Sequence, residues 1–238
     1  MKLCMIGTGY VGLVSGTCFA DIGNHVICVD KDKNKIEKLN AGISPIYEPG
    51  LNELIKKNYS AKRLFFTTDL KKAISLSDII FICVGTPNKK GSLKVDLSFV
   101  YKCTKEILKY TKKKKIIVTK STVPIGTGDE IEKIIKKKKK LFNVVSNTEF
   151  LREGDAIRDF RFPDRIVIGS NEKNIFKVMK KLYTPLINKG AKFFTSTRRG
   201  AELIKYASNA FLATKITFIN ELANLCEKSG INIEDVSL

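Results

Sequence analysis

The feature that most constrains the fold is a glycine-rich turn, which stands between an apolar strand and an apolar helix at the start of the chain. The segment "CMIGTGYVGLVSG" places Gly7, Gly9 and Gly12 in the pattern G-x-G-x-x-G. The first glycine permits a tight turn, the second lets the backbone approach a pyrophosphate, and the third allows close packing of helix against sheet. Because a helix N-terminus offers free N–H groups and a positive dipole end, this turn predicts a dinucleotide site.

An acidic residue at the end of the next predicted strand supports that interpretation. Asp30 follows Gly12 by 18 residues, where an acid would bind the ribose hydroxyls of the dinucleotide. A carboxylate repels a 2′-phosphate, so Asp30 favours NAD over NADP, although the lysines at 31, 33 and 35 weaken this preference. The predicted cofactor-binding residues of this region are Gly7, Gly9, Tyr10, Val11, Gly12, Asp30 and Lys35.

Most of the chain alternates between short apolar runs and longer segments of helical period. This alternation predicts an α/β fold, a Rossmann-like doubly wound parallel sheet with crossover helices. The fully apolar run "DIIFICVG" fits a strand that is covered on both faces. The predicted strands lie at 2–6, 25–29, 64–66, 78–84, 116–119, 142–146, 165–169 and 191–195.

From about residue 200 the pattern changes to a single long helix. "GAELIKYASNAFLATKITFINELANLCEKSG" is one helical segment, and it ends at Ser229 and Gly230, a good C-terminal stop. It is apolar on most faces, which predicts burial between domains or subunits. We therefore expect a Rossmann-like NAD-binding domain over residues 1–198 and a long α-helical connector, through which the chain dimerises, over residues 199–238.

Two further loops follow predicted strands, "VGTP" at 84–87 and "KSTVPIGTG" at 120–128. The carboxyl ends of parallel strands share one edge of the sheet, and this fold binds its ligands there. Thr86, Ser121 and Thr122 are therefore candidates for contacts with cofactor or substrate. The alternative for each hydroxyl is a helix N-cap. Their shared edge favours the functional interpretation.

The segment "SNTEFLREGDAIRDF" sets Glu149 and Glu153 four positions apart, directly after an apolar run. On one helical turn these carboxylates would share a face and point into one cleft. The alternative is a first-turn acid that interacts with the helix dipole. Arginine suits phosphate and carboxylate groups, but salt bridges and subunit contacts are the preferred interpretation for most of the arginines that crowd here. They are Arg152, Arg158, Arg161 and Arg165.

On the long helix, Lys205 and Asn209 are spaced i, i+4 and share a face. A cation and an amide donor that are aimed at a developing oxyanion stabilise it in a dry cleft. The same stripe turns apolar at Leu212 and Ile216, whereas a solvated face would stay polar. The alternative, which spacing alone favours, is an ordinary surface lysine.

The net charge of +19 raises the question of a nucleic acid or an anionic membrane surface as a partner. Only seven of the 43 basic residues are arginine, and no aromatic residue interleaves with the lysine runs at 112–115 and 136–140 to stack bases. Lysine-rich solvated surface is therefore the preferred interpretation, with no nucleic acid and no membrane as partner. No apolar run reaches roughly 18 residues and no signal peptide precedes the first strand, so we expect a cytoplasmic protein.

The six cysteines form no C-x-x-C pair and no cluster with His25, the one histidine, so no metal site is expected. Most of them lie in apolar runs, where they behave as small buried hydrophobic residues. None stands beside a base as an activated thiolate would.

Taken together, these motifs resemble the UDP-glucose/GDP-mannose dehydrogenase family. Matching stretches cover nearly the whole chain in family order: "GTGYVGLVSGTCFADIGNHVICVD", "PIYEPGL", "VGTP", "KSTVPIGT", "NTEFLREGDAIRDFRFPDRIVIG" and "AELIKYASNAFLATKITFINE". "YEPGL" and the 150–169 segment favour UDP-glucose over GDP-mannose or N-acetylated sugars. The resemblance implies oxidation of the C6 alcohol of UDP-glucose to UDP-glucuronate, with reduction of two NAD molecules and a cysteine that carries first a thiohemiacetal and then a thioester.

The resemblance also implies roles for individual residues. Glu149 would be the acid/base of thioester hydrolysis, and Glu153 would neighbour the nicotinamide. Lys205 and Asn209 would hold the developing oxyanion, and Thr122 would help to position a water. The substrate-binding residues would be Glu149, Phe150, Leu151, Arg152, Lys205 and Asn209.

One part of the family pattern is missing. The nucleophilic cysteine of the family belongs to a later glycine-rich segment, and the sequence ends before that segment and before the UDP-binding C-terminal domain. Cys226 lies about five turns past Lys205 on the connector helix and cannot replace that cysteine. We therefore expect NAD binding, reduced or absent activity of the chain alone, and a homodimer through the long helix. The alternatives are a non-catalytic NAD-binding module completed in trans, a dehydrogenase of another nucleotide sugar, and a basic protein with a nucleic-acid role.

Overall fold

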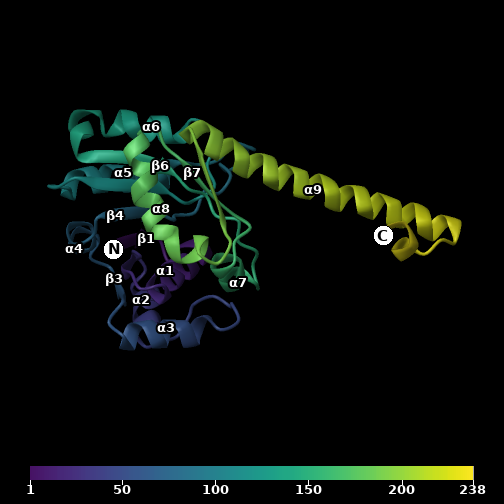
Figure 1. The fold of residues 1–238 in the computed structure, drawn as a ribbon, viewed down its shortest axis with the longest axis horizontal. Coiled ribbons are helices and arrows are strands. Elements are labelled where there is room, and N and C mark those ends of the chain that lie inside the picture. The colour runs from purple at the N-terminus through teal and green to yellow at the C-terminus, as the bar shows by residue number, and fades with distance from the viewer. Residues whose placement is uncertain (238) are drawn as a thin grey trace.

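The computed structural model describes residues 1–237, which form an α/β body with one long helix that leaves it (Figure 1). Eight strands make a single sheet in the order β3-β2-β1-β4-β5-β6-β7-β8, and all eight predicted strands are present. The strands are β1 (Lys2–Ile6), β2 (His25–Val29), β3 (Leu64–Thr67), β4 (Ile79–Ile82), β5 (Lys115–Thr119), β6 (Phe142–Ser146), β7 (Arg165–Gly169) and β8 (Lys192–Ser196).

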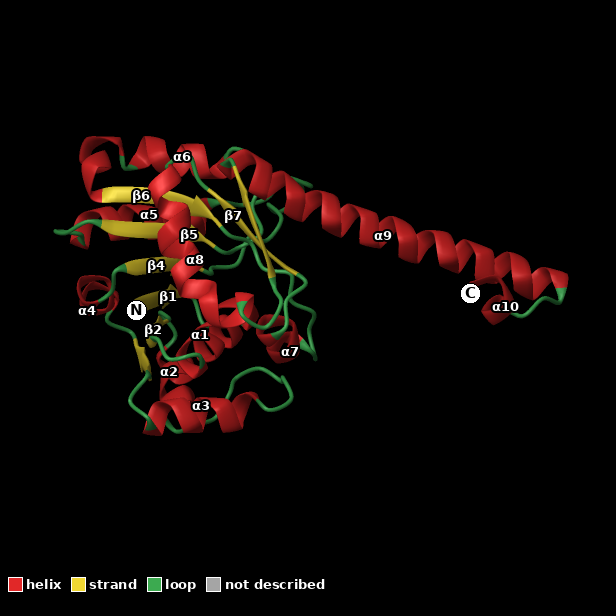
Figure 2. Cartoon of the chain, in the orientation of Figure 1, coloured by secondary structure: helices red, strands yellow, loops and turns green. Residues whose placement is uncertain are grey.

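Helices cover both faces of this sheet (Figure 2). One core cluster packs strands against α1, α3, α7 and α8, and the other packs them against α4, α5 and α6. Successive side chains of a strand point to opposite faces, so Met5 joins the first cluster and Ile6 joins the second. The helices of the body are α1 (Tyr10–Asp21), α2 (Lys33–Asn40), α3 (Leu51–Ser60), α4 (Leu70–Leu76), α5 (Ser98–Tyr110), α6 (Thr127–Ile134), the 3-10 helix Lys136–Leu141, α7 (Ala156–Arg161) and α8 (Lys173–Ile187).

One pairing departs from the predicted parallel sheet. Strands β1 to β6 pair in parallel, but β6 meets β7 antiparallel at Ser146 and Gly169, and β7 then pairs with β8 in parallel. A parallel crossover needs a connection long enough to return the chain to the opposite edge of the sheet, usually a full helix. Between these strands lies α7, whose six residues rise roughly 9 Å, so the chain does not return to the edge where β6 began, and β7 runs back until its last residue meets the last residue of β6.

The long helix is α9 (Arg198–Ser229), and Gly230 ends it in the left-handed conformation, as predicted. Its first two turns are fastened to the body. Glu202, 1% exposed, accepts hydrogen bonds from two backbone N–H groups at the start of α6, Gly126 at 2.6 Å and Gly128 at 2.9 Å, and from the Ser146 hydroxyl at 3.1 Å. Arg198 is equally buried and pairs with carboxylates of α6. These contacts set the direction in which α9 leaves the body.

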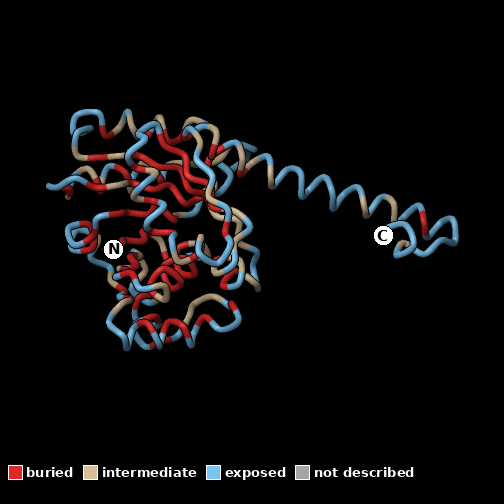
Figure 3. Tube along the Cα trace, in the orientation of Figure 1, coloured by how far each residue is buried: buried red, intermediate tan, exposed pale blue. Residues whose placement is uncertain are grey.

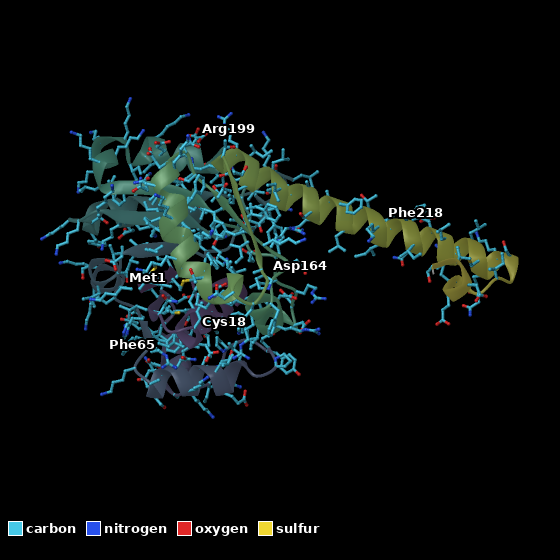
Figure 4. All side chains as sticks on the ribbon, in the orientation of Figure 1. Met1, Cys18, Phe65, Asp164, Arg199 and Phe218 are labelled. Carbon is cyan, nitrogen blue, oxygen red and sulfur yellow. The ribbon has the colours of Figure 1, made fainter. Side chains whose placement is uncertain are left out.

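Beyond these turns α9 projects from the body, and the short helix α10 (Ile233–Ser237) packs against its far end (Figure 1). Figure 3 colours most of this projecting part as exposed, in contrast to the buried strands of the body. Phe211 and Phe218 are 67% and 63% exposed, and Figure 4 shows Phe218 on the free part of the helix. The sequence predicts that these apolar side chains are buried, but the described residues of this chain do not cover them.

The two lysine runs are largely exposed and meet at the edge of the sheet where β5 and β6 begin. Residues 114 and 136–140 line one hollow of about 750 Å³ there. The last lysine of the first run, Lys115, is instead 5% exposed and donates to the carbonyl oxygen of Ser77. Across residues 1–237, no helix is both long and apolar enough to span a bilayer.

Candidate active site

The glycine turn after β1 has the geometry that a dinucleotide site requires. Gly7 adopts φ +102°, and a Cβ there would lie 2.7 Å from the carbonyl oxygen of Cys83. A Cβ on Gly12 would lie 1.9 Å from the carbonyl oxygen of Gly7, so only glycine lets α1 pack this close to the turn. Gly9, the N-cap of α1, is the opposite case, because a Cβ on it would meet no atom within 4 Å. Open space at the helix N-terminus is what a pyrophosphate needs.

Asp30 lies at the end of β2 beside this turn and is partly exposed. Its Oδ2 accepts hydrogen bonds from the backbone N–H of Thr8 at 2.9 Å and from the Thr8 hydroxyl at 2.8 Å. Burial raises the pKa of Asp30, but the hydrogen bonds from Thr8 and Asp32 and the charge of Lys35 outweigh it, and the pKa lies below its usual value. The carboxylate therefore shapes the turn and keeps free lone pairs for a ribose.

The loops that follow β4 and β5 meet at the same edge of the sheet. The Thr86 hydroxyl donates to the backbone oxygen of Thr122 at 2.9 Å, and the Ser121 hydroxyl donates to the backbone oxygen of Val84 at 2.6 Å. Neither bond is a helix N-cap, which was the alternative for these hydroxyls. Both hydroxyls tie one loop to the other, so part of their function is to hold the shape of this edge.

Glu149 and Glu153 do not share a helical turn, so that prediction is wrong. Residues 147–152 have no regular secondary structure, residues 153–154 form a turn, and α7 begins only at Ala156. Gly154 takes φ +89°, which interrupts any helix at this point. Glu149 consequently faces the interior, whereas Glu153 is exposed. The segment 147–155 is called the 147–155 loop below.

Glu149 lines a cavity of about 40 Å³ together with Lys120, Asn147 and Tyr183. Its Oε2 is buried and has no hydrogen-bond partner among the described residues. Burial raises the pKa of Glu149 against the opposing charges of Lys120 and Lys205. A cavity of this size has room for one or more water molecules, and a carboxyl group with a raised pKa suits proton transfer.

Lys205 reaches this site from the second turn of α9 and is 8% exposed. Burial lowers its pKa, and the charge of Glu149 opposes that shift. Two cations lie near the Phe150 ring, with Lys205 Nζ 5.1 Å and Arg165 Cζ 4.7 Å from its centroid. Asn209, one turn further along α9, is exposed. The structure thus brings Glu149, Phe150 and Lys205 together and leaves Asn209 exposed.

The remaining predicted residues are close to these. Leu151 packs on the core cluster that contains α1, and Val11 is half-buried in α1. Arg152 is exposed and pairs with Asp159 at 2.6 Å, in keeping with the preferred salt-bridge interpretation. The hydroxyl of Tyr10 accepts a hydrogen bond from the backbone N–H of Gly154 at 2.8 Å, which joins the glycine turn to the 147–155 loop.

None of the cysteine thiols with a shifted pKa has thiolate character. Burial raises the pKa of Cys4 and Cys18 to about 12 each, and it raises that of Cys103 to about 11. Cys83 lies under the glycine turn near Glu149, and burial raises its pKa well above the usual value. Among residues 1–237, no three or more His, Cys, Asp or Glu side chains gather as metal ligands would.

Two residues of this region were missed by the sequence reasoning. Lys120 is 4% exposed and lines the Glu149 cavity, and its place directly after a predicted strand was the available signal. Glu48 is 6% exposed, although it lies in a loop between α2 and α3. Nothing in its local sequence predicts burial, because its partners come from distant segments.

Comparison with known proteins identifies the family of the chain. Residues 1–187 match the NAD binding domain of the UDP-glucose/GDP-mannose dehydrogenase family, and residues 199–238 match the central domain of the same family. A UDP-glucose 6-dehydrogenase of Rhizobium meliloti is 55% identical over all of this chain and 55% of its own length. The UDP-glucose 6-dehydrogenase TuaD of Bacillus subtilis is 49% identical over 99% of this chain and 51% of its own length.

Solved structures show the same fold. A GDP-mannose dehydrogenase of Pseudomonas aeruginosa superposes with a TM-score of 0.94 at 37% identity. The match covers 100% of this chain and 56% of the chain of that enzyme. A UDP-glucose dehydrogenase of Pyrobaculum islandicum superposes with a TM-score of 0.92 at 37% identity, over 98% of this chain and 55% of its own. The chain therefore spans about half the length of the relatives it matches.

Proposed function

Because the chain belongs to the UDP-glucose/GDP-mannose dehydrogenase family, we propose that it is the cofactor-binding part of a UDP-glucose 6-dehydrogenase. This enzyme oxidises the C6 alcohol of UDP-glucose to the carboxylate of UDP-glucuronate and reduces two NAD molecules. The observation that carries the proposal is the meeting of three parts at one edge of the sheet. These are the glycine turn, Glu149 with its buried Oε2 and its cavity, and Lys205 from α9.

The residues of the turn fit NAD, the cofactor of this family domain. Gly9 leaves open space for the pyrophosphate, and the N-terminus of α1 supplies its N–H groups and dipole. Asp30 accepts from the ribose hydroxyls and disfavours a 2′-phosphate. NAD, when bound, supplies the acceptor for the hydride. Thr86, Ser121 and the exposed Glu153 would contact the nicotinamide half.

Glu149 and Lys205 perform the proton and charge chemistry. With its raised pKa, Glu149 holds or releases a proton at Oε2, next to a cavity that admits water. Lys205 places a positive charge where an oxyanion develops, in a site from which the protein excludes most water. Thr122 orients the water at Glu149. Asn209 follows Lys205 by one turn on the same face of α9, where its exposed amide would be available to the sugar.

The nucleophile is not supplied by the cysteines near the site. Cys83, near Glu149, is buried, and its thiol stays protonated at neutral pH. The proposal therefore divides the function, with residues 1–198 as the NAD-binding domain and residues 199–238 as a helical connector. The exposed apolar side chains of α9 support a homodimer through this helix.

A second candidate function is an NAD-binding module that a separate chain completes. The observation that favours it is again the exposed apolar face of α9, which a different partner would cover equally well. Under both candidates the 238-residue chain alone should form no NADH. The second candidate further requires that a separate C-terminal polypeptide associate with the chain and restore NADH formation.

Calorimetric titration tests the proposal. NAD should bind the chain, UDP-glucose should bind weakly, and GDP-mannose should bind more weakly still. NADH absorbance with NAD and UDP-glucose together should not rise. Absence of NAD binding would refute the proposal, and steady NADH formation would refute the inference that no cysteine of this chain supplies the nucleophile. Tighter binding of GDP-mannose than of UDP-glucose would assign another sugar.

A further inference from the structure

Glu48 is a buried carboxylate that the chemistry above does not use. It lies in the loop between α2 and α3 and is 6% exposed. No lysine or arginine pairs with it among the described residues, so neutral donors must compensate its burial. The donors are the Tyr10 hydroxyl, the backbone N–H of Gly154 at 2.9 Å and the backbone N–H of Ile157 at 3.2 Å.

These donors come from the two halves of the proposed site. Tyr10 is the first residue of α1, directly after the N-cap Gly9 of the glycine turn. Gly154 belongs to the 147–155 loop, which carries Glu149 and Glu153, and Ile157 lies in the first turn of α7 just beyond it. The N–H of Gly154 also donates to the Tyr10 hydroxyl at 2.8 Å. Tyr10, Glu48 and Gly154 therefore form one hydrogen-bonded unit.

The unit matters because it adds a hydrogen-bonded restraint between the 147–155 loop and α1, which the bonds from Asn147 to Thr119 and from Arg152 to Asp159 do not supply. Residues 147–152 lack the backbone pairing of a helix or strand, and residues 152–154 are exposed. Segments with these properties open locally at low free-energy cost. A carboxylate with three donors restrains the loop against α1, and the first turn of α1 is the part that a bound pyrophosphate immobilises.

We propose that Glu48 is a positioning residue that couples the glycine turn to the 147–155 loop, so that a dinucleotide bound at the turn orders the loop that carries Glu149 and Glu153. This inference rests on the proposed function, because it requires NAD at the turn. The coupling path is short: the N-terminus of α1, the Tyr10 hydroxyl, the Glu48 carboxylate, and the N–H groups of Gly154 and Ile157. When a bound dinucleotide makes the α1 end of this unit rigid, less conformational entropy has to be lost to order the loop at the other end.

Amide hydrogen exchange of the 238-residue chain, with and without saturating NAD, tests this coupling. Two peptides report separate events: residues 5–14 report occupancy of the turn, and residues 149–157 report order of the loop. In the unchanged chain NAD should slow exchange in both peptides, by about tenfold in the loop, a typical coupling between sites. Glu48→Gln should keep the slowing at 5–14 and lose it at 149–157.

Two further variants make the result specific. Tyr10→Phe keeps the ring and removes only the hydroxyl, so it should also lose the NAD-dependent slowing of the loop. It serves as the test if Glu48→Gln does not fold. Glu53→Gln makes the same chemical change at an exposed glutamate of α3 and should behave like the unchanged chain.

The outcomes separate the coupling from a purely structural role and from the proposed function. A structural Glu48 would speed exchange of the loop with and without NAD but leave the NAD-dependent ratio near tenfold, which would overturn the coupling. NAD protection at 5–14 with none at 149–157 in the unchanged chain would also overturn it, while the proposed function would stand. Protection at neither peptide would refute NAD binding and the coupling together.

Discussion

Replacement of Asp30 by alanine should weaken both the fold and NAD binding, for separable reasons. Asp30 Oδ2 accepts from the N–H and the hydroxyl of Thr8, and Oδ1 accepts from the N–H of Asp32 at 3.1 Å. Thr8 is fully buried, so its N–H has no access to water once the acceptor is gone. An orphaned buried donor costs about 1–3 kcal/mol, and we expect the free energy of unfolding to fall by about 2 kcal/mol.

The loss of NAD affinity follows from the ribose contact. Hydrogen bonds to a charged acceptor contribute about 1.5–3 kcal/mol each, so the expected increase in Kd is about 10-fold to 100-fold. Asp30→Asn separates the two effects, because the amide oxygen still accepts from the Thr8 N–H while the charge and the second acceptor oxygen are lost. It should therefore bind NAD weakly and remain more stable than Asp30→Ala.

The stability effect also has a defined pH dependence. Burial raises the pKa of Asp30, but its hydrogen bonds from Thr8 and Asp32 and the charge of Lys35 hold the pKa below the usual 3.8. A carboxyl group with a lowered folded pKa contributes stability above its unfolded pKa and loses that contribution as the pH falls through the folded pKa. The advantage of the unchanged chain over Asp30→Asn should thus be complete at pH 7 and vanish in strong acid.

Urea unfolding followed by circular dichroism measures the first effect, and calorimetry with NAD measures the second. Asp164→Ala is the control, because it makes the same change at an exposed aspartate that directly precedes β7 and lies outside the glycine turn. Unchanged NAD affinity of Asp30→Ala would refute the ribose contact. Unchanged stability would refute the function of Asp30 as the acceptor for Thr8.

Three further predictions concern the long helix and the surface. Glu202→Ala leaves two N–H groups of α6 without their acceptor and should lower the free energy of unfolding by about 3 kcal/mol in urea, whereas Glu221→Ala, exposed on the same helix, should change it little. Phe218→Glu should convert a dimer to a monomer in sedimentation experiments, and a dimer that survives would place the interface elsewhere. Duplex DNA should bind the lysine-rich surface only at low ionic strength; retention at about 0.15 M salt would contradict the expectation of no nucleic-acid partner.

Much of this protein was determined by its local sequence. The short apolar runs predicted all eight strands, because a strand that is buried on both faces of a sheet needs apolar residues throughout. The glycine turn and Asp30 could also be predicted from the sequence, because each acts within one strand–turn–helix unit. Gly230 marked the end of α9 for the same reason, since a left-handed C-terminal residue is a local requirement.

Other features were decided only by the tertiary structure. The spacing of Glu149 and Glu153 suggested one helical face, but Gly154 and the short α7 placed one inside and one outside. The reversal between β6 and β7 came from the length of the connection between them and not from either strand. Glu48, Lys120 and Glu202 were buried by segments distant in sequence, and the pKa of Glu149 depends on that burial. Burial removes a side chain from water only once the distant segments have packed together, so a local sequence pattern cannot predict the resulting pKa shift.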